Sequence, residues 1–425
     1  MRHKDVEERM ADGEHLRTQV STPLIIATIL REKGITGVHT HFRQLCQYLE
    51  RQGRPATLVT PFSWGRPLIK PVFGVRYLLE RCSGSANVWW YRHWHEVFLH
   101  QALRRRLAAV DDCVIYAQCP VSARAALRAR RGPHQRVIMA VHFRISQADE
   151  WASKDRGQIA RGGRMFRAIR SLEREVIAQV DGLVYVSRWA QEALTGWLPA
   201  AATVPSAVID NFIAPIEAKA RPEPIGDLVT IGNLEAVKNH RYLFQVLAEA
   251  KRAGFAYTLD VFGEGPLRPE LQRLARSLGV DGLVRLHGFR ADVRGLLPGY
   301  RAYVHASYFE SSSFAIIEAM AAGLPIVAGG MGPLTELFDE GVEGRFWPLD
   351  DPASAATVLI GLMDDEATRS MAAAAALTRF RRGFDAEVIA PRLLSFVMNA
   401  EANPGPRNRT WNVPAADRAM KQPLR

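Results

Sequence analysis

The chain has 425 residues, of which 48% are hydrophobic, so it is long enough for two domains with full cores. Residues 1–217 hold 31 Lys and Arg against 20 Asp and Glu, whereas residues 218–425 hold 24 of each, so the net charge of +11 lies in the first half. The four cysteines include no C-x-x-C pair, which argues against a disulfide framework and a zinc site. No early segment is apolar for long enough to span a bilayer or reads as a signal peptide, so we expect a cytoplasmic protein.

The first half begins with a strand, a glycine loop and a helix. Apolar residues 24–30 predict the strand, the segment KGITGVHTH carries Gly37, and residues 40–51 predict the helix. A second strand near 57–60 completes a βαβ unit. Glycine lets the backbone pass close to a bound group, and a helix N-terminus adds partial positive charge. A plain turn would use the same residues, so the loop alone does not indicate a site.

A histidine follows the next clear strand pattern. Residues 137–141 are apolar, and His142 comes directly after them, at the carboxyl end of the predicted strand. Doubly wound sheets bind their ligands at this end. His142 is therefore a candidate site residue, although a histidine that only packs in a loop would look the same.

The alternation of strands and helices stops once and then restarts, which predicts two doubly wound sheets. The interruption, residues 214–226, contains three prolines and several charges and predicts a linker. We therefore expect one Rossmann-like domain over residues 20–217 and a second over 218–400. The head at 1–19 and the tail at 401–425 are expected to be poorly ordered and flexible.

The second half opens with LVTIGNLEAVKNHRYLFQVL, which reads as a strand, a turn and a helix start. The turn contains Gly232 and Asn233, and Lys238 precedes the helix. An ammonium group beside a helix N-terminus suits a phosphate, although a single lysine is more often a surface residue. Lys238 is thus a candidate phosphate ligand.

Two further loops follow strands of the second half. In LDVFGEGPLRPEL, Gly263 stands at the end of a strand, where a backbone can approach a ligand closely. Phe289 and Arg290 come just after the strand predicted at 284–287. A plain turn between strand and helix would need neither side chain, so these two residues carry a weaker signal.

The segment SYFESSSFAIIEAMAAGLPIVAGG is the most informative part of the chain. Ser313 is expected to cap a helix over residues 314–322, which Gly323 ends. The free N–H groups of its first turn, near Phe314 and Ala315, suit a pyrophosphate.

Two glutamates flank this helix start. Glu310 lies just before the turn, and Glu318 lies one helical turn past Phe314. Their carboxylates can accept hydrogen bonds from the hydroxyls of a sugar and a ribose beside the phosphate groove.

These motifs resemble those of the family 4 retaining glycosyltransferases, also called glycosyl transferases group 1. The family's pair of glutamates with seven intervening residues is matched by Glu310 and Glu318. The resemblance covers most of residues 20–397, strongly over 228–352 and weakly over the first domain. It implies the GT-B fold, in which two Rossmann-like α/β domains face each other across a cleft, the first for the acceptor and the second for the donor.

The resemblance also implies the activity. A sugar would pass with retention from a nucleotide-diphosphate sugar to a hydroxyl of a glycan or lipid-linked acceptor, in polysaccharide or glycoconjugate biosynthesis. It places Glu310, His142 and Lys238 at the reaction centre. The donor residues that it implies are Gly37, Gly232, Asn233, Lys238, Gly263, Phe289, Arg290, Glu310, Ser313, Phe314, Ala315 and Glu318.

Asn233 departs from the family, which often has an arginine at this turn, so the site depends more on Lys238 or another cation. No Asp-x-Asp motif appears near the phosphate segments, so we expect neither a metal nor a cofactor. Two alternatives stay open: a degenerate, non-catalytic GT-B protein and a basic nucleic-acid-binding protein. We expect no nucleic acid, because the neutral second half carries the best motifs. The basic first half could instead bind anionic lipid at the inner face of a membrane, or be a solvated surface.

Overall fold

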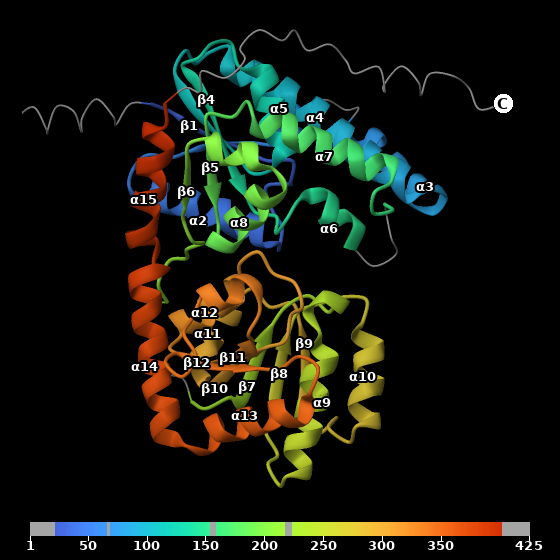
Figure 1. Cartoon of the computed structure of the whole chain (residues 1–425), viewed down its shortest axis with the longest axis vertical. Helices are drawn as coiled ribbons and strands as arrows, with labels where there is room; N and C mark the ends of the chain where they lie inside the picture. Colours follow the sequence, from blue (N-terminus) through green and yellow to red (C-terminus); the bar gives the residue numbers. More distant parts are fainter. Residues whose placement is uncertain (1–21, 66–68, 154–158, 217–222, 402–425) are drawn as a thin grey trace, which may run out of the picture.

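The computed structural model describes residues 22–65, 69–153, 159–216 and 223–401, which form two α/β domains stacked end to end (Figure 1). The predicted head at 1–19 and the predicted tail beyond residue 401 lie outside the described residues. Each domain contains a six-stranded sheet whose neighbouring strands all run parallel, with helices on both faces. The predicted α/β class with two doubly wound sheets is confirmed.

The first sheet has the strand order β2-β1-β3-β4-β5-β6. Its strands are β1 (Leu24–Ala27), β2 (Thr57–Val59), β3 (Cys113–Ala117), β4 (Gln135–Val141), β5 (Gly182–Tyr185) and β6 (Ser206–Val208). The helices of this half are α2 (Gly37–Arg51), η1 (Pro61–Trp64), α3 (Ile69–Cys82), α4 (Gly84–Leu107), α5 (Pro120–Ala129), α6 (Gln147–Ser153), α7 (Arg164–Ile177), α8 (Arg188–Trp197) and η2 (Pro199–Thr203). Along β1, Ile25 and Ala27 enter one core cluster, whereas Leu24 and Ile26 enter the opposite one. Because both faces are covered, the strand is apolar throughout rather than alternating.

The second sheet has the order β12-β11-β10-β7-β8-β9. Its strands are β7 (Gly226–Ile231), β8 (Leu259–Phe262), β9 (Val284–Gly288), β10 (Tyr300–His305), β11 (Ile326–Gly329) and β12 (Gly344–Trp347). The helices of this half are η3 (Ala236–Lys238), α9 (His240–Arg252), α10 (Arg268–Ser277), α11 (Val293–Leu296), η4 (Leu297–Gly299), α12 (Phe314–Ala321), η5 (Gly332–Glu336), α13 (Pro352–Asp364), α14 (Glu366–Gly383) and α15 (Ala386–Asn399).

In each sheet the strand order reverses once, between β1 and β3 in the first and between β7 and β10 in the second. Ligands of doubly wound proteins bind at the carboxyl ends of the strands at this point. There, β7 runs into Gly232, and β10 runs into the loop that carries Glu310. In the first sheet, β1 leads to the loop before Gly37, and His142 directly follows the end of β4. The topology thus directs the predicted site residues of both halves to one region.

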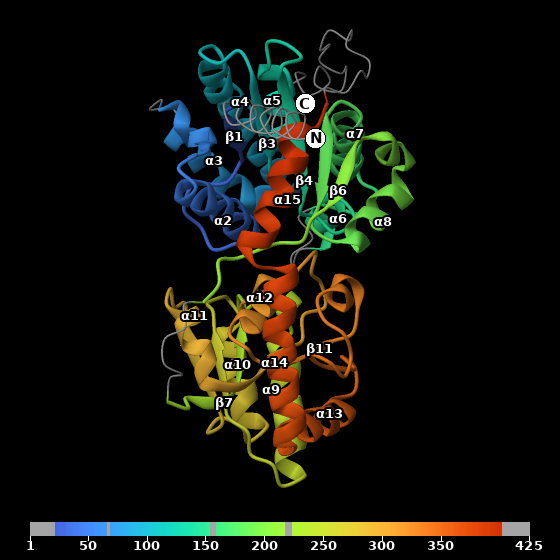
Figure 2. The same ribbon diagram turned by 90° about the vertical axis from the view of Figure 1, so that its left-hand side faces the viewer.

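The last helix returns to the first domain. Figures 1 and 2 show α14 beside the second domain and α15 continuing upward against the first. The apolar face of α15, which includes Ile389 and Leu393, is fully buried against residues of the first sheet and α2, among them Ile26 and Leu45. The predicted range of the second domain, 218–400, therefore includes a helix that packs on the first domain. The spacing of apolar residues in the sequence shows that one face of this helix is buried, but it does not show which domain covers that face.

The two crossings between the domains are hydrogen-bonded to each other. Ile213, on the outward path, pairs with Asp385, on the return path, as a parallel bridge. The N–H of Ile213 donates to the carbonyl of Phe384 at 3.1 Å, and the N–H of Ala386 donates to the carbonyl of Ile213 at 3.0 Å. Both connections thus cross at one point.

Candidate functional site

A cleft of about 1130 Å³ separates the two domains. It is lined from the first domain by Gly37, Thr40, Arg43 and Gln44, among others, and from the second by Gly232, Asn233, Lys238, Gly263, Phe289, Arg290, Glu310, Ser313, Phe314, Ala315 and Glu318. The predicted donor residues of both halves therefore face one space. His142 lines a smaller chamber that adjoins this cleft.

Helix α12 starts at the cleft. Ser313 is its N-cap residue, as predicted, but the expected hydrogen bond from its side chain to the first turn is not formed. Phe314 and Ala315, the first two helical residues, line the cleft. The N–H groups of a first helical turn have no partner within the helix, so this end presents donors and partial positive charge to the cleft.

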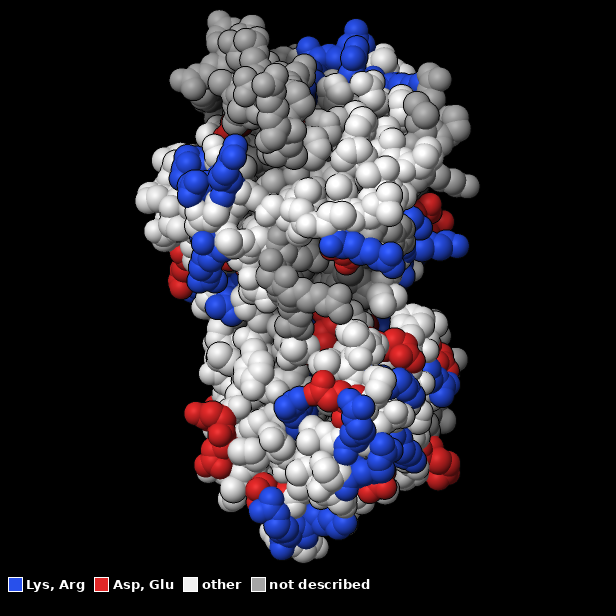
Figure 3. Space-filling view, turned by 90° about the vertical axis from the view of Figure 1, so that its right-hand side faces the viewer, with Lys and Arg blue, Asp and Glu red and all other residues white. Residues whose placement is uncertain are grey.

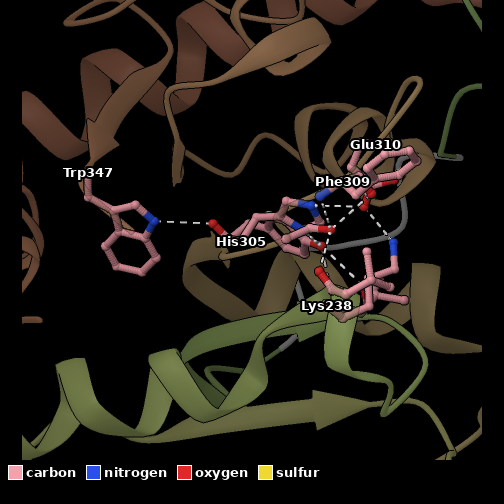
Figure 4. A network of polar contacts seen from close by, with 9 residues as sticks. Lys238, His305, Phe309, Glu310 and Trp347 are labelled. Carbon is pink, nitrogen blue, oxygen red and sulfur yellow. Dashed lines mark hydrogen bonds and ion pairs between the residues drawn. The ribbon is translucent and has the colours of Figure 1, made fainter. Parts of the chain in front are cut away.

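Lys238, Glu310 and His305 form a polar cluster at the carboxyl end of β10 (Figure 4). Nζ of Lys238 donates to Oε1 of Glu310 at 2.5 Å. Nε2 of His305 lies 3.2 Å from the same oxygen, without the alignment of a hydrogen bond. The indole N–H of Trp347 donates to the carbonyl of His305 at 3.2 Å and fixes the strand end.

The turn that carries Lys238 is anchored to the loop that carries Glu310. The N–H of Tyr308 donates to the carbonyl of Val237 at 3.0 Å, and Oγ of Ser307 donates to the same carbonyl at 3.1 Å. Asn239, directly after Lys238, has φ 52°, a left-handed conformation that asparagine and glycine adopt more readily than other residues.

The cluster keeps Glu310 ionised. Burial alone would raise the pKa of Glu310, but the adjacent Lys238 and His305 outweigh burial and lower this pKa to about 2. Burial, together with the charges of His305 and Lys238, lowers the pKa of His240 to about 3. At neutral pH the cleft therefore holds a carboxylate at Glu310, with a neutral imidazole nearby.

Glu318 has a different environment. Burial raises its pKa to about 6, although Arg294 and Arg43 act in the opposite direction. Nε of Arg294 lies 3.8 Å from Oε1 of Glu318, and Nη2 of Arg294 donates to the carbonyl of Ala214 at 2.6 Å. The two glutamates of the motif thus differ in ionisation: Glu310 is firmly anionic, whereas Glu318 titrates near pH 6.

Two glycines show how closely the backbone packs around the cleft. A Cβ on Gly263 would lie 1.9 Å from the carbonyl oxygen of Gly232, so no larger residue fits there without a backbone shift. A Cβ on Gly37 would lie 3.5 Å from the ring of Phe314, an ordinary contact across the domain boundary. Phe289 and Arg290 also line the cleft. The residue Phe289 is 59% exposed, and Arg290 donates two hydrogen bonds to Asp292.

His142 lies in the adjoining chamber of about 300 Å³, together with Glu310 and Phe314. Its Nε2 lies 3.0 Å from Oε1 of Gln118, and its ring contacts that of His41 edge to face, with centres 4.7 Å apart. Burial lowers the pKa of His142 well below its usual range, so the imidazole is neutral at pH 7.

Contacts between the domains flank this chamber. The backbone N–H groups of Arg188 and Trp189, at the start of α8, donate to the carboxylate of Glu336 at 2.8 and 2.6 Å. The guanidinium of Arg144 lies between the rings of Trp189 and Phe309, 4.9 and 4.2 Å from their centres. Phe309 directly precedes Glu310, so these contacts position the Glu310 loop against the first domain.

Several site residues were missed by the sequence analysis. His305, Arg294 and Gln118 contact predicted residues, and Arg43 lines the cleft. A histidine at the end of the largely buried strand β10 was a signal for His305. The others lie on elements whose relation to the motifs depends on the tertiary fold.

Among the residues that the structure describes, no three His, Cys, Asp or Glu side chains gather as a metal site. A search of the same residues finds no helix with the length and hydrophobicity needed to cross a membrane.

Comparisons with known proteins match both halves. The family described as "Glycosyl transferases group 1" matches residues 226–365, and "Glycosyltransferase Family 4" matches residues 35–215. Glycogen synthase of Mycobacterium tuberculosis is 27% identical over 253 residues, 58% of this chain and 61% of the relative. D-inositol 3-phosphate glycosyltransferase of Corynebacterium kroppenstedtii is 34% identical over 149 residues, 33% of each chain. The matches thus span less than two thirds of these relatives.

Solved structures match over more of the chain. Sucrose-phosphate synthase of Thermosynechococcus elongatus has a TM-score of 0.66 at 15% identity, covering 88% of this chain and 97% of that one. Anabaena HepE, solved with UDP and glucose, has a TM-score of 0.64 at 18% identity, covering 88% and 98%. At such identities the likeness shows the fold, and it confirms the predicted GT-B arrangement.

Proposed function

Because the chain belongs to the family 4 glycosyltransferases of the GT-B fold, we propose that it transfers a sugar from a nucleotide-diphosphate sugar to an acceptor hydroxyl. The observation that carries this proposal is the shared cleft, where the start of α12, the ammonium of Lys238 and two glutamates surround one space. The known structures that share the fold include one solved with UDP and glucose, which agrees with such a donor.

In this proposal the donor diphosphate binds between the first turn of α12 and Lys238. Helix N–H groups and an ammonium stabilise negative charge, and the charge grows as the nucleotide diphosphate leaves. Lys238 is 26% exposed at its side chain, so it can reach a ligand while it pairs with Glu310. Glu318 lies one turn deeper and accepts the ribose hydroxyls, and the backbone around Phe289 and Arg290 flanks the base.

Glu310 and His142 act on the transferred sugar. With a pKa near 2, Glu310 cannot donate a proton at neutral pH and instead accepts hydrogen bonds from sugar hydroxyls. We propose transfer with retention, in which the acceptor attacks from the side of the departing phosphate and that phosphate takes the proton. Neutral His142 then faces the sugar without adding positive charge.

The test is a binding screen by calorimetry and thermal shift with UDP, GDP, ADP and their common sugar conjugates. We expect selective stabilisation by one nucleotide, weakened at least tenfold by Lys238→Ala and by Glu318→Ala. Lys251→Ala is the matched control, because Lys251 is an exposed lysine outside the cleft, and it donates to the carbonyl of Gly279. A chain that binds none of the nucleotides would refute the transferase function.

We further propose that the reaction needs neither a metal ion nor an organic cofactor, because Lys238 and the start of α12 supply the charge stabilisation. Donor turnover should then be unchanged when EDTA replaces Mg²⁺ in the assay. Loss of turnover with EDTA, restored by Mg²⁺ or Mn²⁺, would contradict this.

For the acceptor, we propose a glycan or lipid-linked hydroxyl reached at the inner face of a membrane, within polysaccharide or glycoconjugate biosynthesis. Lys and Arg predominate over the first domain in Figure 3, whereas the second domain shows both signs. Basic surfaces attract anionic lipid over about a Debye length. Flotation with anionic and with neutral liposomes at low and high salt tests this, and absence of salt-sensitive binding to the anionic vesicles would count against it.

Asn233 favours one second candidate, a non-catalytic protein of the same fold. It lines the cleft where an arginine is frequent in the family, and an amide supplies no charge to the diphosphate. A chain of this kind would bind the nucleotide sugar and neither hydrolyse nor transfer it. Asn233→Arg would then tighten nucleotide binding without giving turnover, whereas in an active enzyme it should leave turnover measurable.

A further inference from the structure

His142 and Gln118 lie next to each other in the chamber of about 300 Å³ that adjoins the cleft. Gln118 directly follows β3 and His142 directly follows β4, and these two strands are neighbours in the first sheet. Both residues therefore stand at the edge where doubly wound sheets bind ligands. Glu310 and Phe314 line this chamber as well as the cleft. A sugar ring attached to a diphosphate at the start of α12 would therefore enter the chamber beside His142.

The side-chain amide of Gln118 is buried, and its two ends have different partners. Its Nε2 donates to the backbone carbonyl of Tyr116 at 3.4 Å, and its Oε1 lies 3.0 Å from Nε2 of His142. A backbone carbonyl only accepts hydrogen bonds, so the amide nitrogen must face Tyr116. The reverse orientation would place two oxygens against each other in a residue that is only 2% exposed. The amide oxygen of Gln118 therefore faces His142.

This amide determines where His142 carries its proton. Oε1 of Gln118 is an acceptor, so Nε2 of His142 must bear the hydrogen that joins them. Burial lowers the pKa of His142 well below its usual range, so the ring is neutral and holds one ring proton at pH 7. The other nitrogen, Nδ1, is consequently a hydrogen-bond acceptor.

The neighbouring His41 does not use this acceptor. Nδ1 of His41 lies 2.9 Å from Oδ1 of Asn211, and its Nε2 lies 3.0 Å from the hydroxyl of Tyr116, so both of its ring nitrogens are engaged. Among the described residues, none hydrogen-bonds to Nδ1 of His142. This nitrogen is not sealed off, because His142 is only partly buried and lines the chamber. One unpaired acceptor thus remains open to a ligand.

We propose that Gln118 is a positioning residue that holds His142 in the Nε2–H tautomer, so that Nδ1 accepts a hydrogen bond from a hydroxyl or amino group of the transferred sugar. This inference rests on the proposed donor site and adds the chemistry of the group that the sugar turns toward the first domain. A neutral imidazole has one donor and one acceptor, and Gln118 occupies the donor. A hydroxyl at this point pairs with Nδ1, whereas an ether or carbonyl oxygen leaves it unpaired.

Nitrogen NMR of the full chain with isotopically labelled histidine shows the tautomer directly, because protonated and bare ring nitrogens resonate far apart. The chain has 12 histidines, and the signals of His142 are those that disappear in His142→Asn. At pH 8 we expect a protonated Nε2 and a bare Nδ1 in the wild type. In Gln118→Met, which keeps the side-chain length and removes the amide, both signals should move toward the averaged positions of exposed His134. Gln272→Met, on an exposed residue of α10, should leave them unchanged.

Calorimetry tests the contact with the sugar. UDP-glucose, GDP-glucose and ADP-glucose are compared with analogues in which fluorine, which cannot donate, replaces one ring hydroxyl. We expect one analogue to bind the wild type at least about fivefold more weakly than its parent. In His142→Gln the same analogue should lose less than about twofold. His142→Asn should keep the discrimination, because the asparagine oxygen can take the place of Nδ1.

The NMR result decides the tautomer whether or not a donor binds. A hydrogen on Nδ1 of His142 in the wild type would overturn the proposal. So would a hydrogen on both nitrogens, which would show that the charges around the chamber, the carboxylates Glu150 and Glu310 and the Arg92 guanidinium behind Gln147, together favour the imidazolium.

The variants separate the remaining points. Signals of His142 that stay unchanged in Gln118→Met would remove the positioning role from Gln118. Should this variant not fold, judged by its thermal unfolding, Gln118→Asn draws the amide back by one methylene and should give the same averaging. If no nucleotide binds, the donor site fails and the sugar contact fails with it. If a conjugate binds but no fluorinated analogue depends on His142, the donor site stands and this inference is wrong.

Discussion

Replacing Lys238 by methionine should destabilise the protein in a manner that depends on pH. The Lys238 and Glu310 side chains are only 26% and 11% exposed and pair at 2.5 Å. A fall in the pKa of Glu310 from 4.5 to about 2 corresponds to roughly 3 kcal/mol, part of which comes from His305. We therefore assign about 2 kcal/mol to Lys238, within the range for breaking a buried pair after discount for exposure.

The sign of the pH dependence follows from the two folded-state pKa values. In the wild type, the depressed pKa of Glu310 gives stability that is present above pH 4.5 and is lost only as the pH falls toward 2. In Lys238→Met, burial of Glu310 is opposed by less positive charge, so its pKa rises and the variant loses stability as the pH increases. The stability gap between the two proteins must widen from pH 5 to pH 7.5.

Thermal unfolding at the two pH values measures this gap. About 2 kcal/mol corresponds to roughly 4–8 °C in Tm for a domain of this size at pH 7.5, and we expect about half that at pH 5. Lys251→Met, on an exposed lysine, should shift Tm by less than about 1 °C at either pH. A gap that is absent, or equal at both pH values, would refute the account of the Lys238–Glu310 pair.

Three other predictions concern the cleft. Glu318→Gln should raise Tm slightly at pH 8, because the pKa of Glu318 is raised to about 6 and the buried carboxylate therefore destabilises the fold above that pH. The same change should weaken nucleotide binding about tenfold by calorimetry. A variant with unchanged Tm and unchanged nucleotide affinity would contradict the environment assigned to Glu318. Glu336→Gln should lower kcat/KM about tenfold, because the hydrogen bonds from α8 to the Glu336 carboxylate hold the two domains together. Binding of the bare nucleotide should stay unchanged. Loss of nucleotide binding would show that Glu336 has another role. The lowered pKa of His142 keeps its ring neutral from pH 6 to 8, so plots of kcat against pH for the wild type and for His142→Gln should have the same shape in this range. An inflection near pH 6.5 that is present in the wild type and absent in His142→Gln would contradict this.

Much of the fold could be predicted from the sequence because parallel sheets covered on both faces produce unbroken apolar strands. The runs around Ile25 and Met139 predicted such strands. Helix α2 begins at Gly37, three residues before the predicted start, so Gly37 is the first helical residue and not part of the loop. The motif helix α12 began at the predicted residue, yet Ser313 does not make the expected capping bond. Residue type predicts a cap position better than it predicts which donors that side chain satisfies.

The rest depended on contacts between distant segments. The sequence spacing predicted that Glu310 and Glu318 lie near one helix start. It did not predict that their pKa values shift in opposite directions, because the shift of Glu310 comes from Lys238 and that of Glu318 comes from burial. The packing of α15 on the first sheet was not predicted, because the pattern of an amphipathic helix shows which face is buried but not which element covers it. His305 shows the same limit, since its partners come from separate parts of the second domain.

The return of α15 to the first domain means that the first domain is not a continuous piece of chain. A fragment ending before Gly226 would lack the buried face of α15 and would leave the apolar side chains that it covers, such as Ile26, exposed to water. Such a fragment should aggregate when produced alone, and should be recovered in monomeric form when a peptide spanning residues 385–400 is supplied with it. Dissecting this protein therefore requires a first-domain fragment with the last helix grafted back through a short linker. Because Ile213 and Asp385 already lie side by side, that linker can be brief.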